Sequence, residues 1–258
     1  MTILNQLGNI VWIAANVLSA LLFLKLMVTG LGKTYPGFTC FLFLGVTRTV
    51  LAKTIPMSGT RYAEFYMGWE ALFWIVFVFV VLEIHSRVLS GFVGIRTLGR
   101  WVIAGSLTVS LVLTAITLPF DMAARGEFNL FEYFLVAERG VMLGLVFLIV
   151  LQMWFLTWYP VRLSRNIVLH ASLFAVYFLC KAGVLLVQNL GKQQVSQGLN
   201  LAWMSTAIAV QLVWLLFFTP RGEQTEMIVG HRWNLESEQQ LLAQLQTVNA
   251  AIARSARQ

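Results

Sequence analysis

The chain has 258 residues, of which 59% are hydrophobic and only 11% are charged, whereas an average soluble domain is about 25% charged. This composition excludes an ordinary water-soluble protein and indicates an integral membrane protein. The net charge of +7 does not indicate a nucleic-acid partner, because the basic residues are scattered over the loops and form no patch.

Apolar runs recur along the sequence with the length of about 18 to 25 residues that a helix needs to cross a hydrocarbon core of about 30 Å. Turn signals separate them, such as Pro56 after the second run and Pro160 after the fifth, since proline cannot continue a helix. The sequence predicts an all-α polytopic membrane protein, a bundle of seven transmembrane helices within residues 1–219. The predicted spans are 7–29, 37–55, 64–86, 101–119, 130–158, 167–190 and 200–218.

The loops on one side of this predicted bundle hold most of the Lys and Arg residues. The opposite loops carry mainly Arg61, Arg125 and Lys192, together with Asp121 and Glu127. Because cytoplasmic loops are enriched in Lys and Arg, we expect the N-terminus outside and the C-terminus in the cytoplasm, in an inner or plasma membrane. The basic side carries Lys33, Arg87, Arg96, Arg100, Arg162, Arg165, Arg221, Arg232, Arg254 and Arg257.

The cytoplasmic tail, residues 220–258, contains one further predicted helix over 235–256. Asn234 can cap its N-terminus, and acidic residues at its start and arginines at its end both match the helix dipole. The apolar stripe covers only about two heptads, which is short for a coiled coil. We therefore expect a helix that packs on the cytoplasmic face or on lipid, and the alternative is self-association. The stripe residues are Leu241, Leu245, Val248 and Ile252.

Several ionisable residues fall inside the predicted spans, where one charge costs about 2.5 to 3.5 kcal/mol at a helix centre. They lie in the second, third, fifth and sixth spans, and two tyrosines share helix faces with them. One hypothesis is a polar cavity, open to the outside, that suits an anionic or zwitterionic small molecule. The other is a set of structural ion pairs that hold the helices together. The residues are Arg48, Tyr66, Glu70, Glu138, Arg139, Tyr177 and Lys181.

Two histidines, His85 and His170, fall on the same predicted side at similar depth. A pair of imidazoles can ligate a haem between helices, although histidines near membrane ends are ordinarily interfacial. No other cofactor or metal site is expected. The sequence contains no HExxH, GxSxG or Walker A motif, and no motif is specific enough to identify a family.

These features favour a non-enzymatic seven-helix protein that senses or binds a ligand, or that scaffolds a membrane complex. Its partners would be the lipid bilayer, a small molecule in the cavity, and a second copy or another membrane subunit at the tail helix. A channel or transporter with a charged path through the membrane is one alternative, and a haem-binding electron-transfer subunit is the other. Nothing in the sequence calls for an enzyme.

Overall fold

The computed structural model describes residues 3–55, 59–89, 130–158, 161–190 and 193–229. It also describes a few positions in two other segments, at 105–106, 108, 110–112, 115, 243–244, 246–247 and 249–250. The long helices are α1 (Ile3–Val28), α3 (Pro36–Thr54), α4 (Thr60–Val88), α6 (Leu130–Trp158), α7 (Arg165–Leu190) and α8 (Gln193–Phe217). Shorter elements are α2 (Leu31–Thr34), α9 (Pro220–Gln224) and the strands β1 (Val161–Ser164) and β2 (Glu226–Val229).

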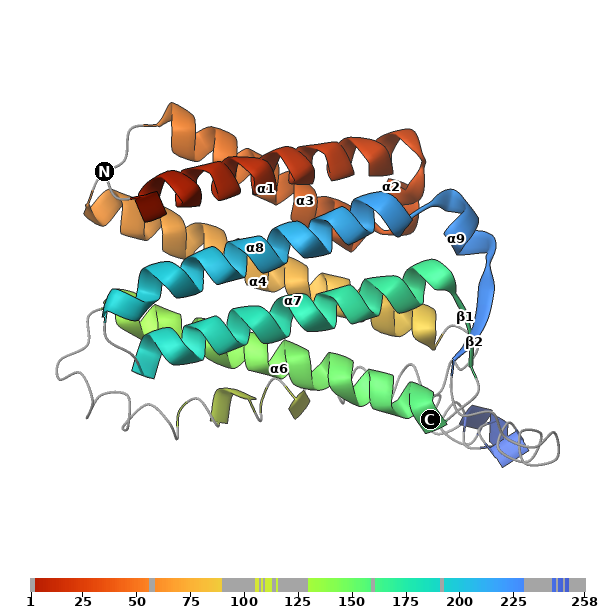
Figure 1. Cartoon of the computed structure of the whole chain (residues 1–258). Helices are drawn as coiled ribbons and strands as arrows, with labels where there is room; N and C mark the ends of the chain where they lie inside the picture. The colour runs from red at the N-terminus through yellow and green to blue at the C-terminus, as the bar shows by residue number, and fades with distance from the viewer. Residues whose placement is uncertain are drawn as a thin grey trace.

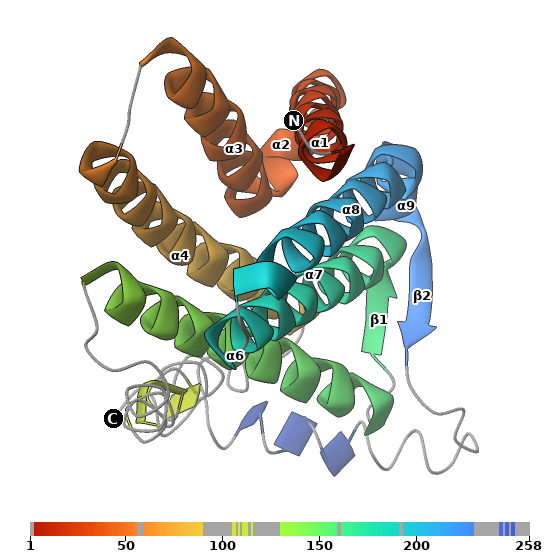
Figure 2. The ribbon, with the colours of Figure 1, turned by 60° about the vertical axis from the view of Figure 1, so that its left-hand side comes forward.

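The long helices form a closed ring in which each helix packs beside its neighbours in the sequence (Figures 1 and 2). The ring closes where α8 packs against α1, and α4 also contacts α7 near the centre. Tyr66 near the start of α4 contacts Phe131 and Phe134 near the start of α6, so α4 and α6 begin at the same end of the bundle. We call this end the N-terminal end, because α1 also begins there.

The helix boundaries follow local chemistry. Gly30 has a φ of 74°, the left-handed conformation that commonly ends a helix, and it separates α1 from α2. Pro36 occupies the first turn of α3, where its missing N–H is not needed. Thr219 caps α9 by accepting a hydrogen bond from the backbone N–H of Gly222, with Pro220 in the first turn.

Five helices in the described part of the chain are long and apolar enough to cross a membrane: 6–28, 60–88, 133–154, 165–185 and 198–217. The membrane class and the helical bundle are therefore supported. The helix α3 occupies the predicted span 37–55 but is not among the five. Most of the predicted span 101–119 lies outside the described residues, as do the tail residues Leu241, Leu245, Val248 and Ile252.

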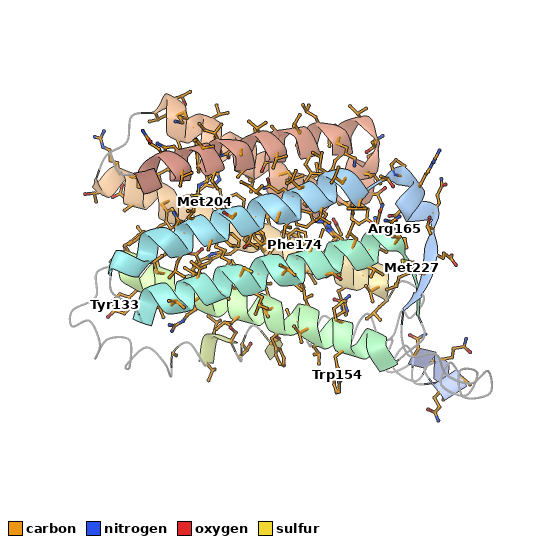
Figure 3. The ribbon with its side chains drawn as sticks, in the orientation of Figure 1. Tyr133, Trp154, Arg165, Phe174, Met204 and Met227 are labelled. Atoms are coloured by element: carbon orange, nitrogen blue, oxygen red, sulfur yellow. The ribbon has the colours of Figure 1, made fainter. Side chains whose placement is uncertain are left out.

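The exposed surface of α6 carries aromatic residues at both ends of its apolar stretch. Tyr133 is 40% exposed and Trp154 is 60% exposed, and Figure 3 places them near opposite ends of the helix. A stretch of 22 residues spans about 33 Å at about 1.5 Å per residue. This matches the hydrocarbon thickness, and Tyr and Trp prefer the two membrane interfaces.

A short antiparallel sheet, which the sequence pattern did not predict, joins β1 to β2 at the end opposite the N-terminus. Val161 pairs with Val229 and Ser164 with Glu226. The sheet holds the segment after α8 against the connection between α6 and α7, and α9 lies beside it (Figure 1).

Candidate functional site: a membrane pocket around a buried ion cluster

A pocket of about 520 Å³ opens in the N-terminal half of the bundle. Its walls come from all the long helices, including the N-terminal halves of α1, α4 and α8 and the C-terminal halves of α3 and α7. The exposed residues Tyr62 and Asn200 line it near the N-terminal end. A volume of several hundred Å³ is typical of small-molecule sites.

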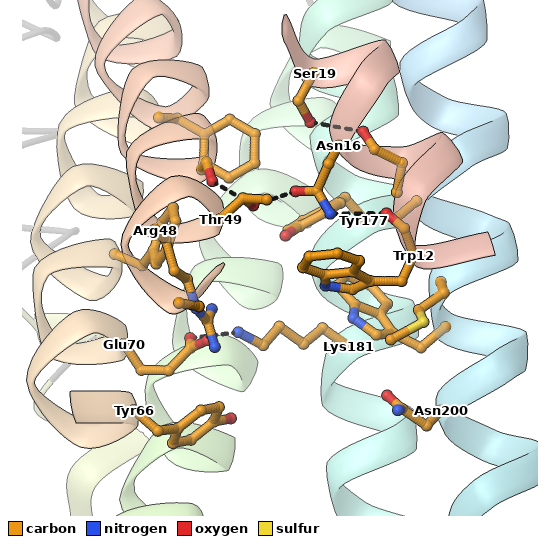
Figure 4. Close-up of a pocket in the computed structure, with 18 of the residues that line it drawn as sticks. Trp12, Asn16, Ser19, Arg48, Thr49, Tyr66, Glu70, Tyr177, Lys181 and Asn200 are labelled. Atoms are coloured by element: carbon orange, nitrogen blue, oxygen red, sulfur yellow. Dashed lines mark hydrogen bonds and ion pairs between the residues drawn. The ribbon is translucent and has the colours of Figure 1, made fainter. Parts of the chain in front are cut away.

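Glu70 of α4 is the centre of an ion cluster in the pocket wall. Its Oε1 lies 2.6 Å from Nη1 of Arg48 on α3, and its Oε2 lies 2.9 Å from Nζ of Lys181 on α7. Lys181 also reaches Oε1 of Glu138 on α6 at 2.7 Å. Figure 4 shows the Lys181 side chain extending across the pocket toward Glu70. Two positive and two negative charges thus join α3, α4, α6 and α7 and cancel in sum.

Aromatic rings surround these charges. The Arg48 guanidinium lies 5.2 Å from the ring centre of Tyr66 and 5.9 Å from that of Phe73, distances at which a cation is attracted to a ring. The Tyr66 hydroxyl donates a 3.4 Å hydrogen bond to Glu138. Tyr177 packs edge to face on Trp203 of α8, with ring centres 4.7 Å apart. The rings exclude water from the pairs and strengthen their attraction.

The four charged side chains are not equally accessible. The exposed fraction of the side chain is 28% for Arg48 and 12% for Lys181, but 7% for Glu70 and 0% for Glu138. The cations are therefore the more accessible members of the cluster, and the carboxylates are the more enclosed. The accessible side of a cluster of zero net charge is thus mainly cationic.

A second polar layer lies deeper in the same pocket. Thr49 donates a hydrogen bond to Asn16 of α1, and Asn16 donates one to the Trp12 carbonyl at 2.7 Å. Gln211 of α8 donates through Nε2 to the Ser19 hydroxyl at 2.8 Å. The Oε1 atom of Gln211 is buried and accepts no hydrogen bond from any residue that the structure describes.

Six of the seven predicted pocket residues line this cavity. Arg139 does not: its residue is only 4% exposed, but it is not among the lining residues. Adjacent positions on a helix point about 100° apart, so Glu138 and Arg139 cannot share one face. The six that converge are Arg48, Tyr66, Glu70, Glu138, Tyr177 and Lys181.

His170 lies outside this pocket, fully buried among aromatic rings of the opposite half of the bundle. The ring centres of Phe38 and Phe174 are 4.7 and 4.8 Å from its own, and Tyr35 and Phe218 lie at 5.2 and 5.4 Å. Neither imidazole nitrogen has a hydrogen-bond partner among the described residues. The rings occupy the space around His170 that a haem plane would need. Across the described ranges, no group of three or more His, Cys, Asp or Glu could hold a metal ion.

Glu223 of α9 forms a second polar cluster at the end opposite the N-terminus. It accepts a 2.6 Å hydrogen bond from the Tyr35 hydroxyl and a 3.3 Å bond from Asn166, and it pairs with Arg87 at 3.4 Å. The Arg87 guanidinium also stacks 4.5 Å from the Tyr35 ring centre. Burial, and then the bond to Glu223, raise the pKa of Tyr35 well above its usual range. The cluster ties α9 to α4, α7 and the α2–α3 corner.

Two charged residues near this end satisfy helix termini. Glu83 of α4 accepts a 2.7 Å hydrogen bond from the backbone N–H of Gly37 in the first turn of α3. Lys25 of α1 donates to the Leu215 carbonyl near the end of α8 at 2.5 Å. The negative charge of Glu83 lies at a helix N-terminus and the positive charge of Lys25 at a helix C-terminus, and both arrangements are favourable to the helix dipole. These two residues therefore stabilise the packing of the helices.

Sequence reasoning did not find the deeper polar layer or the Glu223 cluster. The signal for that layer in the sequence is the presence of Asn16 and Gln211, two polar residues inside apolar runs. Glu223 follows Thr219-Pro220, a pair that often begins a helix, and that signal could have indicated an ordered element after α8. Comparisons with protein-family models, with curated proteins and with solved structures gave no match to this chain.

Proposed function

We propose that this chain is a non-enzymatic seven-helix membrane protein that binds a small polar molecule in the pocket around Glu70, as a sensor or as the binding subunit of a complex. The observation that carries the proposal is the convergence of four ionisable side chains from α3, α4, α6 and α7 on one cavity of about 520 Å³. Intramembrane charges are costly, and they commonly mark a functional site.

The chain path supports the seventh span. Both α4 and α6 run from the N-terminal end to the opposite end, and the seven-span proposal puts one further span between them. Ser106 and Ser110 donate hydrogen bonds to the carbonyls of Gly144 and Gly140 on α6. A spacing of four on both sides is that of two packed helices with small residues at the interface.

The same path supports opposite sides for the two ends of the described chain. The helix α1 begins at the N-terminal end, whereas α9 and β2 lie at the other end (Figure 1). Lys33, Arg87, Arg165 and Arg221 belong to elements at that second end, which the enrichment of Lys and Arg would place in the cytoplasm. Reporter fusions at both termini test this: reporters on the same face would contradict the seven-span proposal.

The ligand-binding proposal can be tested by filling the pocket. A Cβ added at Gly45 meets nothing within 4 Å, and Gly45 lines the cavity, so Gly45→Leu should place its side chain in the pocket. Gly68 on α4 is equally open but exposed on the outside, so Gly68→Leu is the matched control. Neither change should reduce stability, since Leu has a higher helix propensity than Gly by about 0.8 kcal/mol.

The measurement is thermal unfolding of the protein in nanodiscs with a panel of amino acids, carboxylates, amines and sugar phosphates. A ligand at 100 times its Kd stabilises the folded state by about 2.7 kcal/mol. We expect at least one compound to raise the Tm of the wild type and of Gly68→Leu but not of Gly45→Leu. A panel without any effect, or an equal effect on both variants, contradicts the proposal.

A channel or transporter is the second candidate, and one observation favours it. Polar side chains continue from the ion cluster through Thr49 and Asn16 to Ser19 and Gln211, deeper in the bundle. Beyond them lie the packed rings of Phe38, Phe174 and Trp214, which a path would have to cross. The two candidates can be distinguished by measuring the flux of the compound found in the panel across proteoliposomes. A flux that Lys181→Met abolishes favours a transporter or channel, whereas binding without flux favours a sensor.

The tail helix over 235–256 is proposed as the contact with a second copy or another subunit. Truncation after residue 233 should then lower the number of chains in the detergent-solubilised particle, which is its mass divided by the mass of the shortened chain. An unchanged number would contradict self-association through the tail and leave the pocket proposal untouched.

A further inference from the structure

Arg48 is the charged group best placed to meet a ligand in the pocket. Its side chain is the most exposed of the ion cluster at 28%, and only Nη1 donates a hydrogen bond, to Glu70. The other N–H groups of its guanidinium donate to no residue that the structure describes. Guanidinium N–H groups bind carboxylates in a planar, two-bond geometry. This side chain therefore offers a place for one carboxylate.

The charge balance of the cluster limits what may accompany that carboxylate. Arg48 and Lys181 already balance Glu70 and Glu138, so a simple anion would leave one uncompensated negative charge within the membrane. Such a charge costs several kcal/mol in a medium of low dielectric constant. A molecule that brings its own positive charge keeps the sum at zero.

The pocket also has groups that receive an ammonium ion. The unpartnered Oε1 of Gln211 is a buried acceptor in the cavity wall, in a residue that is only 8% exposed. The rings of Trp12 and Trp203 line the cavity, and the Lys53 ammonium already lies 4.9 Å from the Trp12 ring centre. Amide oxygens and indole faces are both good partners for ammonium groups.

We infer that the ligand is a zwitterion with a carboxylate and an ammonium group a few bonds apart, as in a free amino acid. Its carboxylate binds Arg48, and its ammonium faces the indole rings, whereas Gln211 lies in the polar layer deeper in the pocket. This assignment rests on the proposed function above and specifies its substrate class. The ethanolamine headgroup of a phospholipid shares the chemistry of an anion beside an ammonium, so the experiment has to separate the two sources.

The experiment compares three molecules of nearly the same shape: leucine, isoamylamine without the carboxylate, and 4-methylpentanoate without the ammonium. Each is titrated at neutral pH into the full-length protein in phosphatidylglycerol nanodiscs, whose lipid has no ammonium group. Binding is measured by calorimetry and by the Tm. We expect leucine to bind at least tenfold more tightly than either analogue, which corresponds to about 1.4 kcal/mol.

Two variants locate the binding groups without removing a charge. Arg48→Lys keeps the positive charge but loses the planar donor pair, and Trp203→Leu keeps an apolar side chain in the pocket wall but loses the indole face. We expect each to weaken leucine binding about tenfold or more. Gly68→Leu, on the outer face of α4, is the control and should bind leucine like the wild type.

The outcomes separate this inference from the proposed function. If an analogue binds as well as leucine, or if both variants bind leucine normally, the zwitterion assignment is wrong. The same holds if the panel compound that Gly45→Leu excludes is not a zwitterion. If leucine no longer binds when phosphatidylethanolamine is added, the site belongs to the lipid headgroup, and the inference of a free amino acid as the ligand is wrong. If no compound of the wider panel binds, the proposed function itself fails.

Discussion

The two halves of the bundle handle buried polar groups in different ways. In the N-terminal half, the ion cluster around Glu70 borders a cavity and keeps two cations partly exposed to it. In the opposite half, His170 is enclosed by aromatic rings, and Glu223 is bound by Tyr35, Asn166 and Arg87. The first arrangement leaves donors and an acceptor available, and the second uses its groups to hold elements together.

This difference distinguishes the proposed binding site from a cluster that only holds helices together. Ion pairs that only join helices gain from complete enclosure, because exposure to a cavity weakens the attraction. The Glu70 cluster is open on its cationic side although aromatic side chains could have filled the space, as Phe38 and Trp214 do in the other half. The open cluster is therefore the part of the molecule to which the proposed ligand is assigned.

The largest effect on stability is expected from Glu70→Gln. This change removes the carboxylate that balances Arg48 and Lys181 and leaves an excess positive charge in the bundle. Breaking a buried pair in this way costs about 3 to 5 kcal/mol. The measurement is the free energy of unfolding in mixed micelles. Glu64→Gln, at an exposed position on the same helix, is the control. Equal losses of stability in both variants would contradict the assignment of Glu70 as the centre of the ion cluster.

Phe38→Ala should rank second and tests the packed half. Phe38 is 0% exposed and contacts the rings of His170, Phe174 and Trp214. Its removal leaves a cavity that costs about 3 kcal/mol, and ligand binding should not be reduced because Phe38 does not line the pocket. Phe43 on the same helix is 52% exposed, so Phe43→Ala should cost less than about 1 kcal/mol. A loss of ligand affinity in Phe38→Ala would mean that the two halves are coupled.

Glu223→Gln should have a smaller effect, because the amide can still accept the bonds from Tyr35 and Asn166. It loses the charge that Arg87 pairs with at 3.4 Å, and hydrogen bonds to charged groups contribute about 1.5 to 3 kcal/mol. We expect a loss of about 2 kcal/mol and faster proteolysis of the segment after α8. Glu226→Gln, at an exposed position in β2, is the control and should be as stable as the wild type. Glu223→Gln should bind the ligand as tightly as the wild type does.

Much of the fold could be predicted from the sequence, because bilayer thickness sets the length of each apolar run. The predicted span 130–158 agrees with α6 at both ends, and 167–190 differs from α7 by two residues at the start. The span 200–218 lies close to the apolar stretch 198–217, whereas the helix α8 itself begins earlier, at Gln193. Its first turns are polar, so hydropathy gave no signal there. The β1–β2 sheet was missed because four-residue strands leave no periodic pattern.

The charged residues of the site could be predicted from the sequence, whereas its neutral polar residues could not. Arg48, Glu70 and Lys181 are conspicuous within apolar runs, and helical spacing related Tyr66 and Tyr177 to them. Sequence could not place Arg139, because two neighbouring residues on one helix face different partners and only the tertiary packing selects one. It also gave no sign that the carboxylates are more enclosed than the cations, which depends on rotamers and not on position in the chain.

Tyr35→Phe should have the smallest effect on stability of the four changes. It also tests whether the stability contributed by the Glu223 cluster depends on pH. It removes the 2.6 Å bond to Glu223 but keeps the buried ring, so we expect a loss of about 1.5 kcal/mol near neutral pH. Burial raises the pKa of the Tyr35 phenol above its usual value of 10.0. The unfolded chain therefore releases this proton above about pH 10 while the folded chain retains it.

The stability that Tyr35 contributes should then be complete below pH 10 and decline as the pH rises further. Unfolding free energies of the wild type and Tyr35→Phe, measured between pH 8 and 11, should converge as the pH increases. Tyr133→Phe, at an exposed position on α6, should run parallel to the wild type. A difference for Tyr35→Phe that stays constant across this range would mean that its phenol titrates alike in the folded and unfolded chain, and that the Glu223 cluster does not enclose it.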